Sequence, residues 1–188
     1  SDVFINNRLI SLLEKSEFNN LASGRYSGGG FTNISGTFVN EGTVEHGGVI
    51  SVGRSGQYIQ KLAVGSSTTP TTTTPDSPFG NAGRVHIAAG DFIINPLISK
   101  AASATYDQSS TGTTQIDARL QSIGGTVRNA GAITVGAAGE YLQQSPIPQF
   151  LGGSTTNSGS FSNAGTTNIN TGVFENSRGF SNTGTVRI

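Results

Sequence analysis

A loosely repeated phrase constrains the fold of this chain more than any other feature of its sequence. Each copy has an apolar residue, then Asn, then Gly, then β-forming residues, and successive members of the phrase are two positions apart. The copies start at Phe38, Phe79, Val127, Phe161 and Phe180. A chain that repeats itself in this way is typically an array of stacked units, in which each unit packs only on its neighbours.

The residues within one copy alternate as they do in a β-strand. Over residues 161–169, one set of alternate positions carries Phe161, Asn163 and Ile169, whereas the other set carries small or polar residues. A period of two predicts strands with one buried face. Phe161 and Phe180 lie 19 residues apart, which is too short for a βαβ unit but fits one turn of two or three short strands. The sequence therefore predicts an all-β fold, a single-stranded parallel β-solenoid (β-helix).

A longer internal match supports the repeat. Residues 44–60 align without gaps on residues 127–143, and each run contains a pair of glycines three positions apart, Gly53 and Gly56 in the first run. We expect this pair to mark a corner between two strands. Glycine suits a corner because it adopts a positive φ without steric cost.

Residues 1–23 do not follow the repeat. Asn7 is a candidate N-cap for a helix over residues 8–17, in which Leu9, Leu12 and Leu13 would form one apolar face. Such a helix either packs on the domain or, as we favour, caps the first coil, because terminal units of a repeat array must cover their open core. We therefore predict a helical cap over residues 1–23 and a solenoid over residues 24–188.

Three segments interrupt the repeat and are predicted to project as insertions. Insertions in solenoids sit at the corners between strands and commonly project from one face. The second segment is the longest, and it contains either a helical piece near 97–104 or an imperfect coil around 115–123. The three segments cover residues 61–78, 93–125 and 144–160.

The composition excludes several classes of function and suggests a compartment. Lys plus Arg equals Asp plus Glu, so the net charge is zero and no basic face for nucleic acid is expected. The chain has no Cys, which excludes disulfides, thiol catalysis and Cys-based zinc sites. It also has no Met, which indicates a processed chain or a fragment and leads us to expect a secreted or cell-surface protein. No apolar run approaches the roughly 20 residues that span a bilayer, so no membrane insertion is expected.

The recurring asparagines are interpreted as structural residues. Stacked coils place equivalent residues about 4.8 Å apart, so that an Asn amide can donate and accept along the stack. Asn33 and His46 fall in the same register, and the sequon at Asn33 is discounted because that register is buried. The predicted ladder consists of Asn40, Asn81, Asn129, Asn163 and Asn182.

One cluster along the chain resembles a proton-transfer or metal site. Glu41, Glu45 and His46 are close in sequence. In a strand, however, both glutamates would face outward and His46 would face the opposite way, whereas a metal site needs ligands that converge. We therefore expect no metal and no cofactor.

The sequence offers few candidate catalytic residues. A polysaccharide lyase or epimerase would need grouped carboxylates and basic residues, and Asp107, Asp117 and Arg119 are the only candidates. No nucleophile motif and no phosphate-binding loop is present. We therefore predict that the protein is not an enzyme.

Two phrases near the end of the chain resemble a known group of surface proteins. Residues 161–169 read Phe-Ser-Asn-Ala-Gly-Thr-Thr-Asn-Ile, and residues 180–188 read Phe-Ser-Asn-Thr-Gly-Thr-Val-Arg-Ile. They are similar to the repeats of filamentous-haemagglutinin-like and autotransporter-like proteins. The resemblance implies a right-handed parallel β-solenoid with a role in adhesion or surface structure. It implies no catalytic residues.

The functional prediction is end-to-end self-assembly into a filament or surface layer. The strand motif at residues 180–188 has no Pro, no charged cover and no terminal helix over it, and an unprotected edge offers unpaired backbone groups to another copy. The partner is then the chain itself, head to tail. The alternative is an adhesin segment that binds surface glycans or a host surface through its insertion loops, and a lyase or epimerase is the third hypothesis. The predicted assembly residues are Leu9, Leu12, Leu13, Phe180, Val186 and Ile188.

Overall fold

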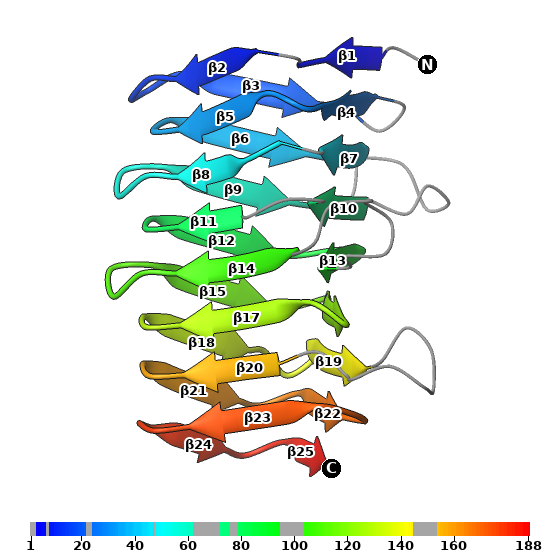
Figure 1. The fold of residues 1–188 in the computed structure, drawn as a ribbon, viewed down its shortest axis with the longest axis vertical. Coiled ribbons are helices and arrows are strands. Elements are labelled where there is room, and N and C mark those ends of the chain that lie inside the picture. Colours follow the sequence, from blue (N-terminus) through cyan, green and yellow to red (C-terminus); the bar gives the residue numbers. More distant parts are fainter. Residues whose placement is uncertain are drawn as a thin grey trace.

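The strands of the protein wind into an elongated stack, with the N-terminus at one end and the C-terminus at the other (Figure 1). The structure is a computed structural model that describes residues 3–6, 8–21, 24–46, 48–61, 72–75, 79–94, 104–144 and 154–188. These residues form 25 strands, and all strand pairs are parallel. Within these residues there is no helix of the length and apolar character needed to cross a membrane.

The strands lie in three sheets, here named A, B and C, and each strand pairs with the strand three places further along the chain. Sheet A contains β1 (Val3–Ile5), β4 (Arg25–Gly28), β7 (Thr43–His46), β10 (Thr72–Pro75), β13 (Asp91–Ile94), β16 (Arg119–Ile123), β19 (Glu140–Gln144), β22 (Thr166–Ile169) and β25 (Thr185–Arg187). Sheet B contains β2 (Leu9–Leu12), β5 (Phe31–Ile34), β8 (Ile50–Val52), β11 (Phe79–Asn81), β14 (Thr105–Gln108), β17 (Thr126–Asn129), β20 (Ser154–Asn157) and β23 (Val173–Asn176). Sheet C contains β3 (Glu17–Asn20), β6 (Thr37–Asn40), β9 (Gln57–Gln60), β12 (Arg84–Ile87), β15 (Thr113–Ile116), β18 (Ala132–Val135), β21 (Ser160–Asn163) and β24 (Phe180–Asn182).

Three consecutive strands, one in each sheet, make one turn, which we call a rung. The first rung is β1–β3, the last complete rung is β22–β24, and β25 begins a further turn in sheet A. This parallel, repetitive β-structure is the arrangement that the alternating sequence predicted, a stack compatible with a β-solenoid.

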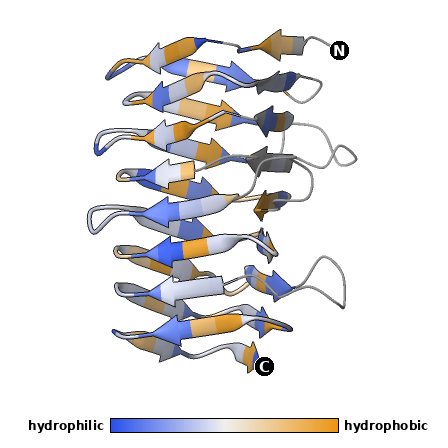
Figure 2. Cartoon of the chain, viewed as in Figure 1, coloured by the Kyte–Doolittle hydropathy of each residue, from blue (hydrophilic) through white to orange (hydrophobic). Residues whose placement is uncertain are grey.

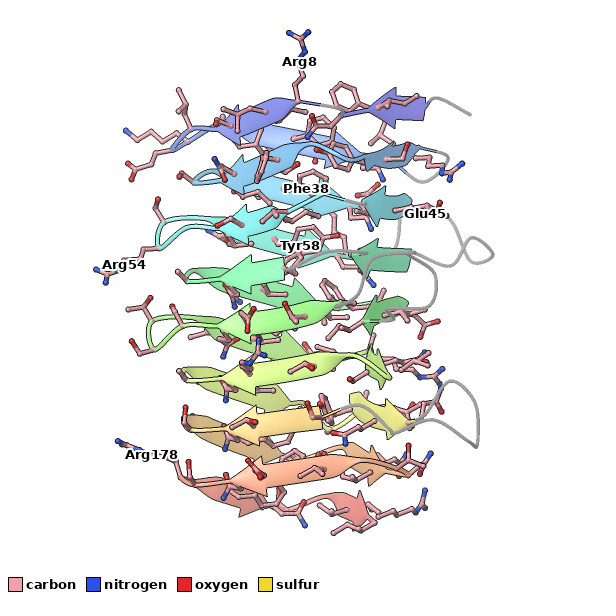
Figure 3. The ribbon with its side chains drawn as sticks, in the orientation of Figure 1. Arg8, Phe38, Glu45, Arg54, Tyr58 and Arg178 are labelled. Atoms are coloured by element: carbon pink, nitrogen blue, oxygen red, sulfur yellow. The ribbon has the colours of Figure 1, made fainter. Side chains whose placement is uncertain are left out.

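Alternate residues of each strand fill the interior. Apolar and polar residues accordingly alternate along the strands in Figure 2. Phe38 and Tyr58, which lie within the stack in Figure 3, have ring centroids 5.3 Å apart with nearly parallel planes. The buried apolar side chains form one cluster that runs from Tyr26 to Ile169. Because burying one large apolar side chain contributes about 1.5–3 kcal/mol, this column is a main source of stability.

The predicted N-terminal helix over residues 8–17 is wrong. Leu9–Leu12 form β2, and Glu17–Asn20 form β3. The turn between them has Lys15 at a φ of 67°, which a right-handed helix does not allow. Strand β2 pairs with β5 in register, Leu9 with Phe31. An isolated helix of this length is marginal in water, whereas the strand gains parallel backbone hydrogen bonds to β5 along one of its edges.

The solenoid continues through most of the predicted insertion over residues 93–125. Strands β14, β15 and β16 lie there in register with their neighbours, at the place where an imperfect coil was one of two options. Strands β10 and β20 likewise fall within the segments 61–78 and 144–160. The remaining parts of these segments, residues 62–71, 76–78, 95–103 and 145–153, lie outside the described residues, and so does most of the helical alternative near 97–104.

The corner glycines do not have the predicted backbone conformation. Among the glycines that the structure describes, a positive φ occurs at Gly90, Gly124 and Gly172. The prediction of a positive φ at Gly53 and Gly56 is therefore wrong.

The corner glycines instead allow successive rungs to approach closely. A Cβ atom at Gly83 would overlap the carbonyl oxygens of Gly53 and Gly56 in the preceding rung, and a Cβ at Gly131 would overlap the carbonyl oxygen of Gly112. The Gly of the repeated phrase is thus required by the neighbouring backbone rather than by its own φ.

A substitution at Gly83 tests this explanation. We expect Gly83→Ala to lower the free energy of unfolding by about 2–4 kcal/mol, because the methyl group forces two rungs apart. Gly80→Ala is the matched control, because the nearest atom to its Cβ would be Ser51 Oγ at 3.9 Å. Urea denaturation of both variants measures the difference. Equal midpoints would contradict the explanation.

Candidate functional site

Buried amide side chains form hydrogen-bonded ladders along the stack. In sheet B, Asn81 donates to Gln108 at 3.0 Å, and Gln108 donates to Asn129 at 2.7 Å. Asn129 then donates to Asn157 at 2.7 Å, and Asn157 donates to Asn176 at 2.5 Å. Each of these bonds joins one rung to the next.

A second set of ladders runs along sheet C, at the two ends of the stack. Asn20 donates to Asn40 at 2.8 Å near the N-terminus, and Asn163 donates to Asn182 at 2.7 Å near the C-terminus. The five predicted ladder residues therefore divide between two corners, Asn81 and Asn129 on sheet B and Asn40, Asn163 and Asn182 on sheet C.

The side-chain amide of Asn129 shows why the repeated motif places Gly two residues after Asn. The Oδ1 atom of Asn129 accepts from Gln108 Nε2 and from the backbone N–H of Gly131 at 3.0 Å. Its Nδ2 atom donates to Asn157 Oδ1 and to the carbonyl oxygen of Ser160 at 3.0 Å. The four hydrogen bonds satisfy the amide within the protein, so that this side chain joins the corners of successive rungs.

A second buried network joins tyrosine and threonine hydroxyls. Tyr58 and Tyr106 each lie 2.6 Å from a threonine Oγ1, in Thr73 and Thr114 respectively. Burial raises the pKa of both tyrosines, and the hydroxyl hydrogen bonds oppose this only in part. Both phenols therefore stay neutral and share hydrogen bonds with threonine hydroxyls in the core.

The three candidate residues for a lyase or epimerase do not converge. Asp107 lies on sheet B and contacts Arg128 Nη1 at 3.0 Å. Asp117 and Arg119 lie on either side of the corner between sheets C and A, and Arg119 contacts Glu140 at 2.7 Å. Each charge is thus engaged by a different partner on the outer surface.

The cluster of Glu41, Glu45 and His46 is likewise divided. Glu41 pairs with Lys61 at 3.3 Å, and Glu45 pairs with Arg25. The side chain of His46 lies outside the described part of the chain. Across residues for which side chains are described, no group of three or more His, Cys, Asp or Glu residues could hold a metal ion.

A polar cluster that the sequence did not indicate lies on the outer face of sheet C. His86 Nε2 is 2.8 Å from Asp117 Oδ2, and Gln115 Nε2 donates to Asp117 Oδ1 at 2.7 Å. Burial acts to raise the pKa of Asp117, but the hydrogen bonds from Gln115 and His86 and the charge of His86 together lower it. The cluster depends on the pairing of His86 with Gln115 in adjacent strands, a register that the sequence alone does not give.

The two ends of the stack expose apolar side chains of the kind that fill its interior. At the first rung, Phe4, the inward residue of β1, is 45% exposed, and Phe18 is half-buried. Leu9 and Phe31, which are 62% and 58% exposed, instead face outward on the flank of sheet B. At the last rung, Phe180 is 38% exposed and lines an apolar groove of about 420 Å³ with Phe174 and Val186. Two of the predicted assembly residues, Leu12 and Val186, are half-buried, and the others are exposed: Leu9, Leu13, Phe180 and Ile188.

Comparison of the chain with family models, with curated proteins and with solved structures finds no match. The site is therefore assigned from its own geometry. Within the described residues, that geometry consists of the buried ladders along the axis and the two apolar end rungs.

The Asn129 amide provides a test of the ladder. We expect Asn129→Ala to lower the free energy of unfolding by about 3 kcal/mol, because it leaves buried amide groups of Gln108 and Asn157 unpaired. The prediction that Asn33 lies in the buried ladder register is wrong, because Asn33 is exposed on the outer face of sheet B. Asn33→Ala is therefore the matched control on the same sheet. Thermal or urea unfolding of both variants distinguishes them, and an equal loss would contradict the ladder.

The lowered pKa of Asp117 predicts that the free energy of unfolding depends on pH in the acid range. A carboxylate with a depressed pKa stabilises the folded state above its ordinary pKa, and this contribution is lost as the pH falls through the folded pKa. The stability advantage of the wild type over Asp117→Asn should therefore shrink between neutral pH and about pH 3. Urea unfolding at both values measures it, and an advantage that is independent of pH would contradict the pairing.

Proposed function

We propose that the protein is a non-enzymatic structural element that associates end to end with copies of itself, outside the cell or at its surface. One observation carries the proposal, namely that both ends of the stack combine exposed core-type side chains with strand edges that have no neighbour on one side. Exposed apolar surface next to an open parallel edge is the combination that proteins normally cover.

The flanks of the stack contrast with its ends. The outward positions of sheet A carry Arg25, Asp91, Arg119 and Glu140, which form ion pairs between rungs or with their neighbours. In Figure 3, Arg54 and Arg178 likewise point away from the flank. Charged side chains of this kind keep flanks apart, because lateral contact would strip them of water. On the flank of sheet A, association along the axis is therefore favoured over association side by side.

The net charge supports the same direction of growth. Lys plus Arg equals Asp plus Glu, so that copies of the chain do not repel each other strongly as they meet. The buried ladders and the backbone hydrogen bonds between rungs also give each copy a rigid end, and a rigid end loses little conformational entropy when it binds.

The resemblance to filamentous-haemagglutinin-like and autotransporter-like proteins agrees with this role and implies a right-handed coil. The hand of the coil stays a prediction. Binding of surface glycans through the insertion loops also stays a prediction, and residues 62–71, 76–78, 95–103 and 145–153 of these segments lie outside those that the structure describes.

The association of the purified chain tests the proposal. We expect sedimentation to show reversible growth with concentration, and electron microscopy to show rods that lengthen without thickening. A chain that stays monomeric at high concentration would overturn the proposal.

Phe180→Asp should lower the association constant by about 30-fold, the effect of removing one strong apolar contact from an interface. Ser181→Asp is the matched control, because Ser181 is the next residue of β24 and its side chain points outward. Unfolding curves verify that both variants are folded. Equal association by the two variants would show that the groove at Phe180 is not the contact.

A further inference from the structure

We propose that a second copy stacks its first rung on the last rung of this chain in one register, and that strand β25 acts as a removable cap on that site. The register places Phe18 of the second copy on Phe180 and Asn20 of the second copy on Asn182. This inference rests on the proposed end-to-end association and specifies its geometry.

The two ends of sheet C carry the same pair of residues in the same positions. At the C-terminal end, Phe161 stacks on Phe180 with centroids 5.6 Å apart and an interplanar angle of 9°. At the N-terminal end, Phe18 stacks on Phe38 with centroids 4.9 Å apart. Joining β24 to β3 of a second copy would therefore continue one aromatic column without a break.

The amide ladders of sheet C match in the same register. Asn163 donates to Asn182, and Asn20 donates to Asn40. The Nδ2 atom of Asn182 is turned back to the carbonyl oxygen of Gly184 in its own corner, at 3.2 Å. In the proposed stack this amide donates instead to Asn20 of the second copy, as Asn163 donates to Asn182 within the chain.

Sheet B accepts the same register. Strand β23 would pair with β2 of the second copy, and Phe174 would face Ile10 of that copy, because both belong to one inward column of sheet B. Phe174 and Phe180 line the open groove at the last rung, so that the arriving rung fills it with apolar side chains.

Sheet A contains the obstacle to this contact. Strand β25 pairs with β22, Thr166 with Thr185 and Thr167 with Val186. With β2 and β3 of the second copy seated on β23 and β24, its strand β1 reaches the same edge of β22. Two strands cannot pair with one edge, so either β25 or the incoming β1 must leave.

The contacts of the two strands indicate that β25 leaves. Phe4, the inward residue of β1, packs on Phe18 and Tyr26 with centroids 5.5 and 5.6 Å away. The inward residue of β25 is the smaller Val186, which lines the open groove. Strand β25 thus protects an edge that would otherwise pair freely, and it opposes association until it is displaced. This assigns Val186 and Ile188 to the cap rather than to the contact between copies.

Removal of the cap provides the first test. The chain without residues 184–188 should associate about tenfold or more tightly than the full chain, because no strand has to be displaced. Thr185→Pro is a second variant of full length, since Pro lacks the N–H that Thr185 donates to the carbonyl oxygen of Gly165 at 2.9 Å. Sedimentation equilibrium measures the association constants, and unfolding curves verify folding.

Comparing the association of the three chains distinguishes the cap role of β25 from end-to-end association itself. Tighter association of both variants supports the cap. If the full chain associates and neither variant associates more tightly, the cap is overturned and the end-to-end function stands. If none of the three chains associates, both are overturned.

Cysteine cross-linking tests the register, since the natural chain has no Cys. In the proposed stack, Asn19 of one copy lies beside Ser181 of the other, with Cα atoms about 4.8 Å apart, a distance that a disulfide spans. A mixture of Asn19→Cys and Ser181→Cys chains should therefore form the mixed disulfide. Glu17→Cys with Ser181→Cys is the control, since it is two residues out of register. Equal yields from the two mixtures would overturn the register.

Discussion

The parallel hydrogen bonding between successive rungs is the constraint on which the rest of the structure depends. Every strand from β4 to β22 has neighbours on both sides, so that the backbone of each rung is satisfied only by the rungs above and below it. At the corner after β17, a side chain adds to the backbone hydrogen bonds between rungs. The Asn-x-Gly motif serves both purposes there, because Asn129 accepts from the N–H of Gly131 and Gly131 allows the preceding rung to approach closely.

The sequence predicted the strands most reliably where this phrase is complete. Residues 161–169 contain Phe161, Asn163 and Gly165, and they form β21 and β22. Strand β14 was assigned to an insertion because Gln108 stands where the phrase has Asn, although its amide continues the ladder just as well. The first rung was assigned to a helix because the spacing of its leucines fits either structure, and the pairing partner that decides between them is 22 residues further along the chain, Phe31 for Leu9.

The site was predicted less completely than the fold. Periodicity identified the ladder residues but could not show that Asn40 and Asn81 belong to different sheets, since both corners use the same phrase. The contact of His86 with Asp117 was out of reach, because it depends on the register of strands that the chain separates by 31 residues. The same register disperses Asp107, Asp117 and Arg119 around the stack, which sequence proximity alone had grouped together.

The flank of sheet A and the two ends of the stack differ in chemistry, because charged side chains line the flank whereas apolar side chains are exposed at the ends. Along the flank of sheet A, ion pairs such as that of Arg119 with Glu140 join neighbouring rungs. At the ends, the interior of the stack is open to solvent at Phe180 and its groove. In a molecule whose rungs bind one another through the same contacts throughout, an open end resembles an interior rung that lacks its neighbour.

Electron cryomicroscopy of the assembled rods is the sharpest test of end-to-end stacking, because it can resolve the junction between two copies. We expect the spacing of about 4.8 Å between rungs to continue through the junction, with β3 of one copy paired to β24 of the next. A junction in which the rung spacing is interrupted, or rods built by contact between flanks, would contradict it.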